Sequence, residues 1–425
     1  MLKSLLSLVL FGLVFSFNLS TLAQVPAQIT NRSFPFPDFG KATITSVLFA
    51  AHTPPTINRI VTENPSRKNL ITLENKAYVR SAYWPGQPGQ PMVFLIPGIG
   101  GVSDKGSVGN LAKIFQSWGY HVVTFNNPLS WQFALTLSPD GAPGYFPEDA
   151  EILYENMLSV KKQLEQKFHV RYSQTLLASY SLGCQHAYEI LKLDDQKKDF
   201  DFSQVLMISP PLDLAYTLHK YDSVNQQGAR INASKSLTVY EELRGRLISL
   251  YEHVISLAPE KVVGYVAQNY PLNNQEGEII IGGNFKASLE EVLYVTSLVH
   301  PQRSQLFKSP LAPKNRNARY AEIKAMSFQD YFQKFILQKM YVRNQFIDSQ
   351  DLLNSFSLKS KIGKLSADER IKFILSQDDP ISKSEDVKLF AETFGDRALV
   401  LNHGGHAGFY WFPGFAADLK SFLKP

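Results

Sequence analysis

The sequence contains little cysteine and has no strong charge bias. Cys184 is the only cysteine in 425 residues, so no intramolecular disulfide can form and the core must stabilise the fold. Because Cys184 follows a glycine at the start of a predicted buried helix, we interpret it as a small core residue, not a reactive thiol. The formal net charge of +5 is spread along the chain, without a basic stripe that would indicate nucleic-acid binding.

A hydrophobic run long enough for a comfortable membrane span is also lacking. The run over residues 5–17 falls short of the roughly 20 apolar residues that a spanning helix needs. Lys3 before it, and small or polar residues after it, are typical of a signal peptide. We predict a signal peptide at residues 1–23, cleaved after Ala23 or alternatively Ala27, and an exported protein that is periplasmic or secreted. An uncleaved anchor is the alternative, and nothing else in the sequence indicates membrane association.

From residue 91 onwards, apolar runs of strand length alternate with segments of helical periodicity. This alternation predicts an α/β fold with a mostly parallel, doubly wound sheet. The predicted strands are 92–96, 121–126, 174–180, 204–209, 371–376 and 398–402. An irregular arm over 28–40 and strand-like pieces at 41–50 and 70–83 precede them.

The alternation stops between residues 212 and 360. A loop of this length without structure would be improbable in a compact domain. The predicted helical segments within it include 235–257, 286–299 and 318–348. Residues 278–281 alternate weakly and are compatible with a small strand. We therefore predict a large, mainly helical cap, 212–360, inserted between two parts of one core, 28–211 and 361–425.

Ser181 lies in the pattern Ser-x-Ser-x-Gly, after an apolar strand and before a predicted helix. This is the setting of a nucleophile elbow, a sharp turn in which small residues on either side of the serine let neighbouring backbone approach. Ser179 stands where glycine is usual. The pattern alone is a weak signal, and its position between strand and helix strengthens it.

A glycine-rich loop, Pro-Gly-Ile-Gly-Gly, follows the predicted strand 92–96. In a site of this kind, the oxyanion hole takes one backbone N–H from such a loop and one from the residue after the nucleophile. We predict that Ile99 and Leu182 supply these groups. A purely structural turn is the alternative, and no lysine follows in the pattern of a phosphate-binding loop.

Acidic residues and a histidine follow the last two predicted strands. Asp378 and Asp379 come after strand 371–376, and His406 lies among glycines after strand 398–402. The chain order Ser, Asp, His is that expected for this fold and differs from the chymotrypsin and subtilisin orders. Four weak signals therefore agree on one serine-hydrolase site.

The four motifs together resemble the α/β-hydrolase family of bacterial esterases related to the yeast medium-chain ethyl-ester synthase/esterases. The resemblance covers about residues 85–215 and 365–425, and Pro97 and Cys184 depart from the family pattern. It implies an α/β-hydrolase fold and carboxylester hydrolysis or acyl transfer on short or medium acyl chains, with no metal or organic cofactor. Counting from Ser376, as in the family, favours Asp379 as the acid, and Asp378 is the alternative.

The resulting prediction is a serine hydrolase that cleaves small-molecule carboxylic esters through an acyl-enzyme. Ser181 is the expected nucleophile, His406 the base and Asp379 the orienting acid. Loop 128–146 would supply apolar walls for an acyl chain, or else pack under the cap. The alternatives for function are an acyltransferase with the same triad, a peptidase or amidase, and a non-catalytic ligand-binding protein on the same scaffold. No nucleic acid, metal or other cofactor is expected.

Overall fold

The computed structural model describes residues 28–30, 34–50, 57–64, 66–67, 77–104, 106–232, 234–299, 306–310, 312–342, 345 and 347–423. The predicted signal peptide at 1–23 lies outside these residues. No helix in the described ranges is both long enough and apolar enough to cross a membrane.

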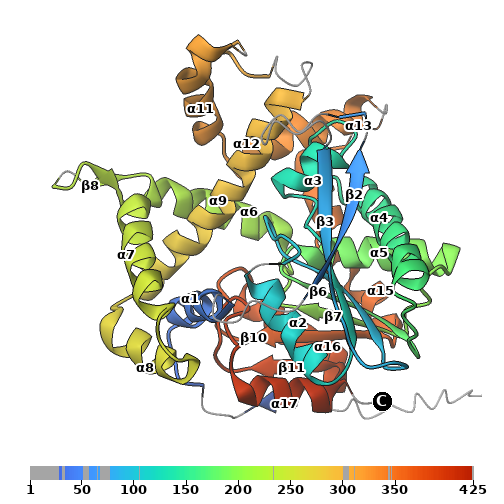
Figure 1. Cartoon of the computed structure of the whole chain (residues 1–425). Helices are drawn as coiled ribbons and strands as arrows, with labels where there is room; N and C mark the ends of the chain where they lie inside the picture. Colours follow the sequence, from blue (N-terminus) through green and yellow to red (C-terminus); the bar gives the residue numbers. More distant parts are fainter. Residues whose placement is uncertain are drawn as a thin grey trace, which may run out of the picture.

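The described residues form a nine-stranded sheet with the order β2-β3-β5-β4-β6-β7-β10-β11-β1 (Figure 1). β3 runs antiparallel to β2 and β5, whereas the other pairings are parallel. The strands are β1 (Gln28–Thr30), β2 (Asn58–Asn64), β3 (Ala77–Trp84), β4 (Met92–Ile96), β5 (His121–Thr124), β6 (Thr175–Tyr180), β7 (Gln204–Ile208), β10 (Ile371–Ser376) and β11 (Ala398–Leu401).

Helices cover both faces of the sheet, and the side chains of β4 show how. Phe94 and Ile96 pack with helices α4 (Phe146–Lys167), α5 (Gly183–Lys197) and α16 (Ser384–Phe394) on one face. Val93 and Leu95 pack with α2 (Ser107–Ser117) and α17 (Pro413–Phe422) on the other. A strand buried on both faces reads as a continuous apolar run, which explains why the sequence signal was strong. The chain has an α/β-hydrolase fold.

The six strands predicted after residue 91 are confirmed, and their ends agree to within two residues. The expectations before residue 91 were less accurate. Segment 41–50, predicted as strand-like, belongs to helix α1 (Phe39–Ala50), and the arm predicted over 28–40 begins with β1, which pairs with β11. Within 70–83, β3 begins at Ala77, and 70–76 lie outside the described residues.

Between β7 and β10 the described chain is helical apart from a small hairpin of β8 (Ile231–Asn232) and β9 (Leu237–Thr238). Residues 278–281 are helical and not a strand, because they lie within α9. The main helices are α6 (Leu214–Gly228), α7 (Val239–Val254), α8 (Pro259–Asn269), α9 (Asn274–Val299), α11 (Arg316–Ala325), α12 (Phe328–Tyr331), a π-helical turn (Phe332–Leu337), α13 (Gln338–Val342), α14 (Ser349–Phe356) and α15 (Ile362–Ala367). All of them except α15 contribute to one apolar core, to which α1 and segment 128–146 also contribute, whereas α15 packs with the sheet. α7 and α8 lie to the left of the sheet in Figure 1.

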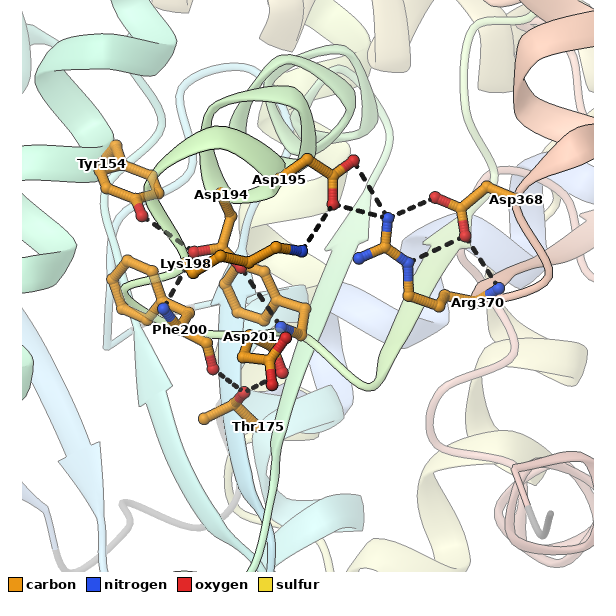
Figure 2. Close-up of polar contacts among 10 residues, drawn as sticks. Tyr154, Thr175, Asp194, Asp195, Lys198, Phe200, Asp201, Asp368 and Arg370 are labelled. Atoms are coloured by element: carbon orange, nitrogen blue, oxygen red, sulfur yellow. Dashed lines mark hydrogen bonds and ion pairs between the residues drawn. The ribbon is translucent and has the colours of Figure 1, made fainter.

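At the amino end of β6 and β7, a buried carboxylate organises the chain between α5 and β7 (Figure 2). Asp194 is fully buried and accepts hydrogen bonds from the hydroxyl of Tyr154 at 2.9 Å and from the N–H groups of Phe200 at 2.9 Å and Phe202 at 3.3 Å. Burial is the main cause that raises the pKa of Tyr154, and the hydrogen bond to Asp194 is the second. The phenol therefore remains protonated and donates its hydrogen. The carboxylate therefore fixes the turn that leads into β7.

A surface ion-pair cluster lies beside this turn (Figure 2). The Arg370 guanidinium donates to both oxygens of Asp195, at 2.9 and 3.1 Å, and to both oxygens of Asp368, at 2.6 and 2.9 Å. Arg370 immediately precedes β10, so these bonds connect the start of β10 to the end of α5.

Candidate active site

Ser181 occupies a sharp turn directly after β6. Its φ of 54° lies in the left-handed region, and its N–H donates to the carbonyl of Ile208 at 2.9 Å. Such a conformation is uncommon for a residue other than glycine and is typical of a nucleophile elbow. A Cβ at Gly98 would lie 2.7 Å from the Ser181 Cβ, and one at Gly183 would lie 2.5 Å from the Pro97 carbonyl oxygen. Glycine at both positions therefore makes room for the turn.

The structure brings His406 and Asp379 next to Ser181. The Nε2 of His406 is 2.9 Å from Ser181 Oγ, and its Nδ1 is 3.2 and 3.1 Å from the two carboxylate oxygens of Asp379. All three side chains are buried. A proton on Nδ1 directed at the carboxylate leaves Nε2 free to accept the proton of the serine hydroxyl. The N–H of Ile381 also donates to Asp379 Oδ1, at 3.1 Å, which fixes the carboxylate.

The neighbouring Asp378 makes different contacts. Its carboxylate accepts hydrogen bonds from the N–H groups of Gly405 at 2.9 Å and Gly404 at 3.3 Å, and from the hydroxyl of Ser376 at 2.6 Å. Asp378 thus holds the loop before His406, whereas Asp379 faces the imidazole.

Helix α1 supports the same loop from the other side. The N–H of His406 donates to Thr43 Oγ1 at 3.0 Å. A Cβ at Gly405 would lie 2.5 Å from the Phe39 carbonyl oxygen, and one at Gly408 would lie 2.4 Å from the Ala42 carbonyl carbon. The glycines around His406 therefore permit close packing on α1. Sequence reasoning missed Thr43, because it placed this segment in a strand.

The two residues predicted for the oxyanion hole, Ile99 and Leu182, line one pocket together with Ser181. Within the described chain, neither backbone N–H has a hydrogen-bond acceptor, whereas the N–H of Gly100 next to Ile99 donates to the Leu129 carbonyl at 3.0 Å. Leu182 immediately precedes α5, where the partial positive charge of a helix amino terminus favours an anion. Both amides are thus available to an oxygen bound beside the serine.

The pocket beside Ser181 encloses about 790 Å³ of space between its lining atoms, a volume that includes open solvent. None of its described lining residues is charged. Leu129, Gly144 and Phe146 come from segment 128–146, which was expected either to supply apolar walls or to pack under the cap. Trp131–Thr136 of this segment form a helix, α3, that does not line the pocket. The other lining residues outside the nucleophile and glycine loops are Pro211, Leu214, Thr217, Leu218, Tyr221, Phe285, Leu289, Phe328, Tyr331, Phe332, Ile336, Phe356 and Ile381.

Neither a metal site nor a thiol nucleophile competes with Ser181 among the described residues. No group of three or more His, Cys, Asp or Glu side chains there is placed to hold a metal ion. Cys184 is buried, and burial raises the pKa of its thiol to about 12. The thiol stays protonated at neutral pH and behaves as a small core residue.

Comparison with known proteins finds solved structures that are similar to this chain at low sequence identity. No protein-family model and no curated protein matches the chain. An α/β hydrolase from Penicillium is 13% identical, with 86% of this chain and 98% of that one covered and a TM-score of 0.38. Carboxyl esterase 2 of the fungus Tuber melanosporum is 13% identical, with 87% and 84% covered and a TM-score of 0.37. A Pyrococcus furiosus esterase is 10% identical, with 87% and 90% covered and a TM-score of 0.34. Similarity of this extent carries no information about the substrate.

Proposed function

We propose that this protein is a serine hydrolase that cleaves carboxylic esters through an acyl-enzyme on Ser181. The observation that carries the proposal is the continuous hydrogen-bonded line from Asp379 through His406 to Ser181, with 2.9 Å between His406 Nε2 and Ser181 Oγ. A serine hydroxyl is a weak nucleophile until an adjacent base accepts its proton, and a base held by a carboxylate meets that need.

In the first half of the proposed reaction, Ser181 Oγ attacks the ester carbonyl carbon while its proton passes to His406 Nε2. Asp379 stabilises the resulting imidazolium, and the N–H groups of Ile99 and Leu182 stabilise the tetrahedral oxyanion. The carbon–oxygen bond to the alcohol then breaks, and the alcohol leaves with the proton from His406. In the second half, water attacks the acyl-enzyme with His406 again as base, which releases the acid and restores Ser181.

The substrate class follows from the lining of the pocket. Because the pocket is apolar and its lining residues carry no charge, an uncharged substituent can enter without losing favourable hydration of a charge. This supports small, neutral esters as substrates. An acyltransferase would use the same residues with an alcohol in place of water, and product analysis with added alcohol separates the two.

A fluorophosphonate probe tests the proposal directly, because it labels only an activated serine. We expect labelling of Ser181 and turnover of chromogenic esters. Ser181→Ala should abolish labelling and lower turnover by on the order of 10⁵–10⁶-fold. Ser179→Ala is the matched control and should still be labelled. The Ser179 side chain is fully buried, and its hydroxyl donates to the Leu206 carbonyl at 3.2 Å instead of facing a substrate. Labelling that persists in folded Ser181→Ala, or that is absent from the unsubstituted protein, would overturn the proposal.

Export is a separate proposal, supported by the signal-peptide pattern of residues 1–23. Sequencing the amino terminus of the protein recovered from the periplasm or medium of an expressing bacterium tests it. We expect a mature protein that begins after Ala23 or Ala27. Retention of the protein in the cytoplasm with the segment intact would contradict it.

A further inference from the structure

One face of α6 forms a wall of the pocket. The last pocket residue on this face, Tyr221, carries a hydroxyl without a hydrogen-bond partner in the described chain. Leu214, Thr217, Leu218 and Tyr221 lie at positions i, i+3, i+4 and i+7 of the helix, so they project from one side, and all four line the pocket. Tyr221 is only 1% exposed. Its hydroxyl is buried and meets no donor or acceptor in the described part of the chain.

Tyr221 lies close to the proposed base. Its ring packs against Phe285 at a centroid distance of 5.1 Å, and Phe285 packs edge-on against the imidazole of His406 at 5.9 Å. Burial, followed by the negative charges of Asp379 and Glu278, raises the pKa of Tyr221 well above 10. The phenol is therefore neutral at neutral pH, and it can donate a hydrogen bond.

The hydroxyl groups of Thr217 and Tyr331, which also line the pocket, have hydrogen-bond partners, unlike the hydroxyl of Tyr221. Thr217 donates its hydroxyl proton to the carbonyl of Ile381 at 2.8 Å, and Tyr331 donates to the carbonyl of Pro143. A buried hydroxyl without a partner destabilises a folded protein, so it calls for an explanation. A ligand oxygen in the pocket would give Tyr221 the partner that the protein does not provide.

We propose that the Tyr221 hydroxyl donates a hydrogen bond to an oxygen atom on the substituent that fills the apolar pocket. The preferred substrates are then esters whose apolar chain carries one uncharged acceptor, such as an ether, carbonyl or hydroxyl oxygen. Plain alkyl esters fit the same space but leave the Tyr221 hydroxyl unpartnered. This inference rests on the proposed esterase activity, and the acceptor can lie on the acyl or on the alcohol side.

Two sets of matched esters distinguish these sides. In the acyl arm, 4-nitrophenyl hexanoate is compared with analogues in which an ether oxygen replaces one chain methylene. In the alcohol arm, hexyl acetate is compared with analogues altered in the same way in the hexyl chain. The quantity measured is kcat/KM of each oxygen-bearing ester divided by that of its alkyl counterpart. For one position in one arm, we expect this ratio to be about 3- to 10-fold higher in the unsubstituted protein than in Tyr221→Phe, the range of one neutral hydrogen bond.

Tyr270→Phe is the control, because the Tyr270 hydroxyl is also buried and without a partner in the described chain, but Tyr270 does not line the pocket. It should leave the ratio unchanged. Tyr221→Phe should also unfold at the same temperature as the unsubstituted protein or a higher one, because it removes an unsatisfied group. Equal ratios in Tyr221→Phe and the unsubstituted protein at every position, or a lower unfolding temperature, would overturn the inference while alkyl-ester turnover upholds the proposed function. Absence of all ester turnover and of serine labelling would overturn both.

Discussion

A buried aspartate lies at each end of the sheet, and the two aspartates differ in the groups to which they are hydrogen-bonded. At the amino end, Asp194 is fully buried and accepts from Tyr154 and from two backbone N–H groups (Figure 2). At the carboxyl end, Asp379 is 6% exposed and pairs with His406. The partners of Asp194 are an aromatic side chain of the core and the adjacent turn, whereas His406 leads to Ser181 and to a pocket.

Burial of a carboxylate therefore does not by itself mark a functional site. Asp194 makes three hydrogen bonds within the protein and stabilises a turn, whereas the line that starts at Asp379 ends at a hydroxyl facing a cavity. In open α/β sheets, ligands bind at the carboxyl ends of the strands. Asp379 lies at that end, next to the pocket, whereas Asp194 lies at the opposite end. Substitutions at the carboxyl end should mainly reduce turnover, whereas those at the amino end should mainly reduce stability.

Among the residues that assist Ser181, the largest effect is expected at the base, His406. His406→Ala removes the only group within reach of the Ser181 hydroxyl proton among the described residues, so ester turnover should fall by on the order of 10⁴–10⁶-fold. His403→Ala is the matched control, because the His403 side chain is 49% exposed and lies 3.8 Å from Asp378 instead. Steady-state kinetics of both folded variants measure the difference. An equal loss in both would contradict the assignment of the base.

The next largest loss of turnover is expected at the orienting acid, Asp379. Asp379→Asn keeps the shape of the side chain but loses the charge that orients and stabilises the imidazolium, so kcat should fall by on the order of 10⁴-fold. Asp378→Asn should lower turnover less than about tenfold and reduce stability, because an amide oxygen can replace only part of the acceptor for Gly404 and Gly405. An inactive Asp378→Asn beside an active Asp379→Asn would reverse the two roles.

At the amino end, Asp194→Ala should leave the N–H groups of Phe200 and Phe202 without an acceptor, whereas the hydroxyl of Tyr154 lies 3.1 Å from Asp199 Oδ2 and can still donate there. At about 1–3 kcal/mol for each of these two unsatisfied groups, the free energy of unfolding should fall by about 2 kcal/mol or more. Turnover per folded molecule should not change. Urea unfolding monitored by circular dichroism gives the first quantity, and titration of folded protein with a fluorophosphonate normalises the second.

Asp195→Ala is the control for Asp194→Ala. The Asp195 side chain is 43% exposed and pairs with Arg370 at the surface, so its loss should cost less than about 1 kcal/mol. If Asp194→Ala lowered kcat at full occupancy of the folded state, the two ends of the sheet would be coupled, and the contrast drawn between them would be wrong.

How well the sequence predicted the fold depended on the kind of burial. Strands such as β4 are buried on both faces, so their apolar runs are continuous and hard to mistake. Segment 41–50 is short, apolar and rich in β-branched residues, a pattern that strands and buried helices share. Packing of α1 against α2, α8 and α9 decides the outcome, and the sequence contains no local sign of it.

The candidate site likewise contains residues that the sequence predicted and residues that it did not. Ser181, Asp379 and His406 each follow a strand, so the topology alone predicted that they would lie at one edge of the sheet. Thr43 and Tyr221 were not predicted, because neither lies in a motif. Thr43 meets the His406 N–H across 363 positions of the sequence. Contacts of that separation follow from the packed helices and not from a local pattern.

Thr43 provides the smallest of the expected effects and a test of whether α1 belongs to the catalytic end of the sheet. Thr43→Val keeps the shape of the side chain but removes the oxygen that accepts from the His406 N–H at 3.0 Å. One neutral hydrogen bond contributes about 0.5–1.5 kcal/mol, so kcat should fall by about 3- to 10-fold through a less well positioned imidazole. Thr43→Ser keeps the acceptor and should retain most of the turnover. If Thr43→Val lowered only the unfolding temperature and left kcat unchanged, α1 would stabilise the fold without positioning His406.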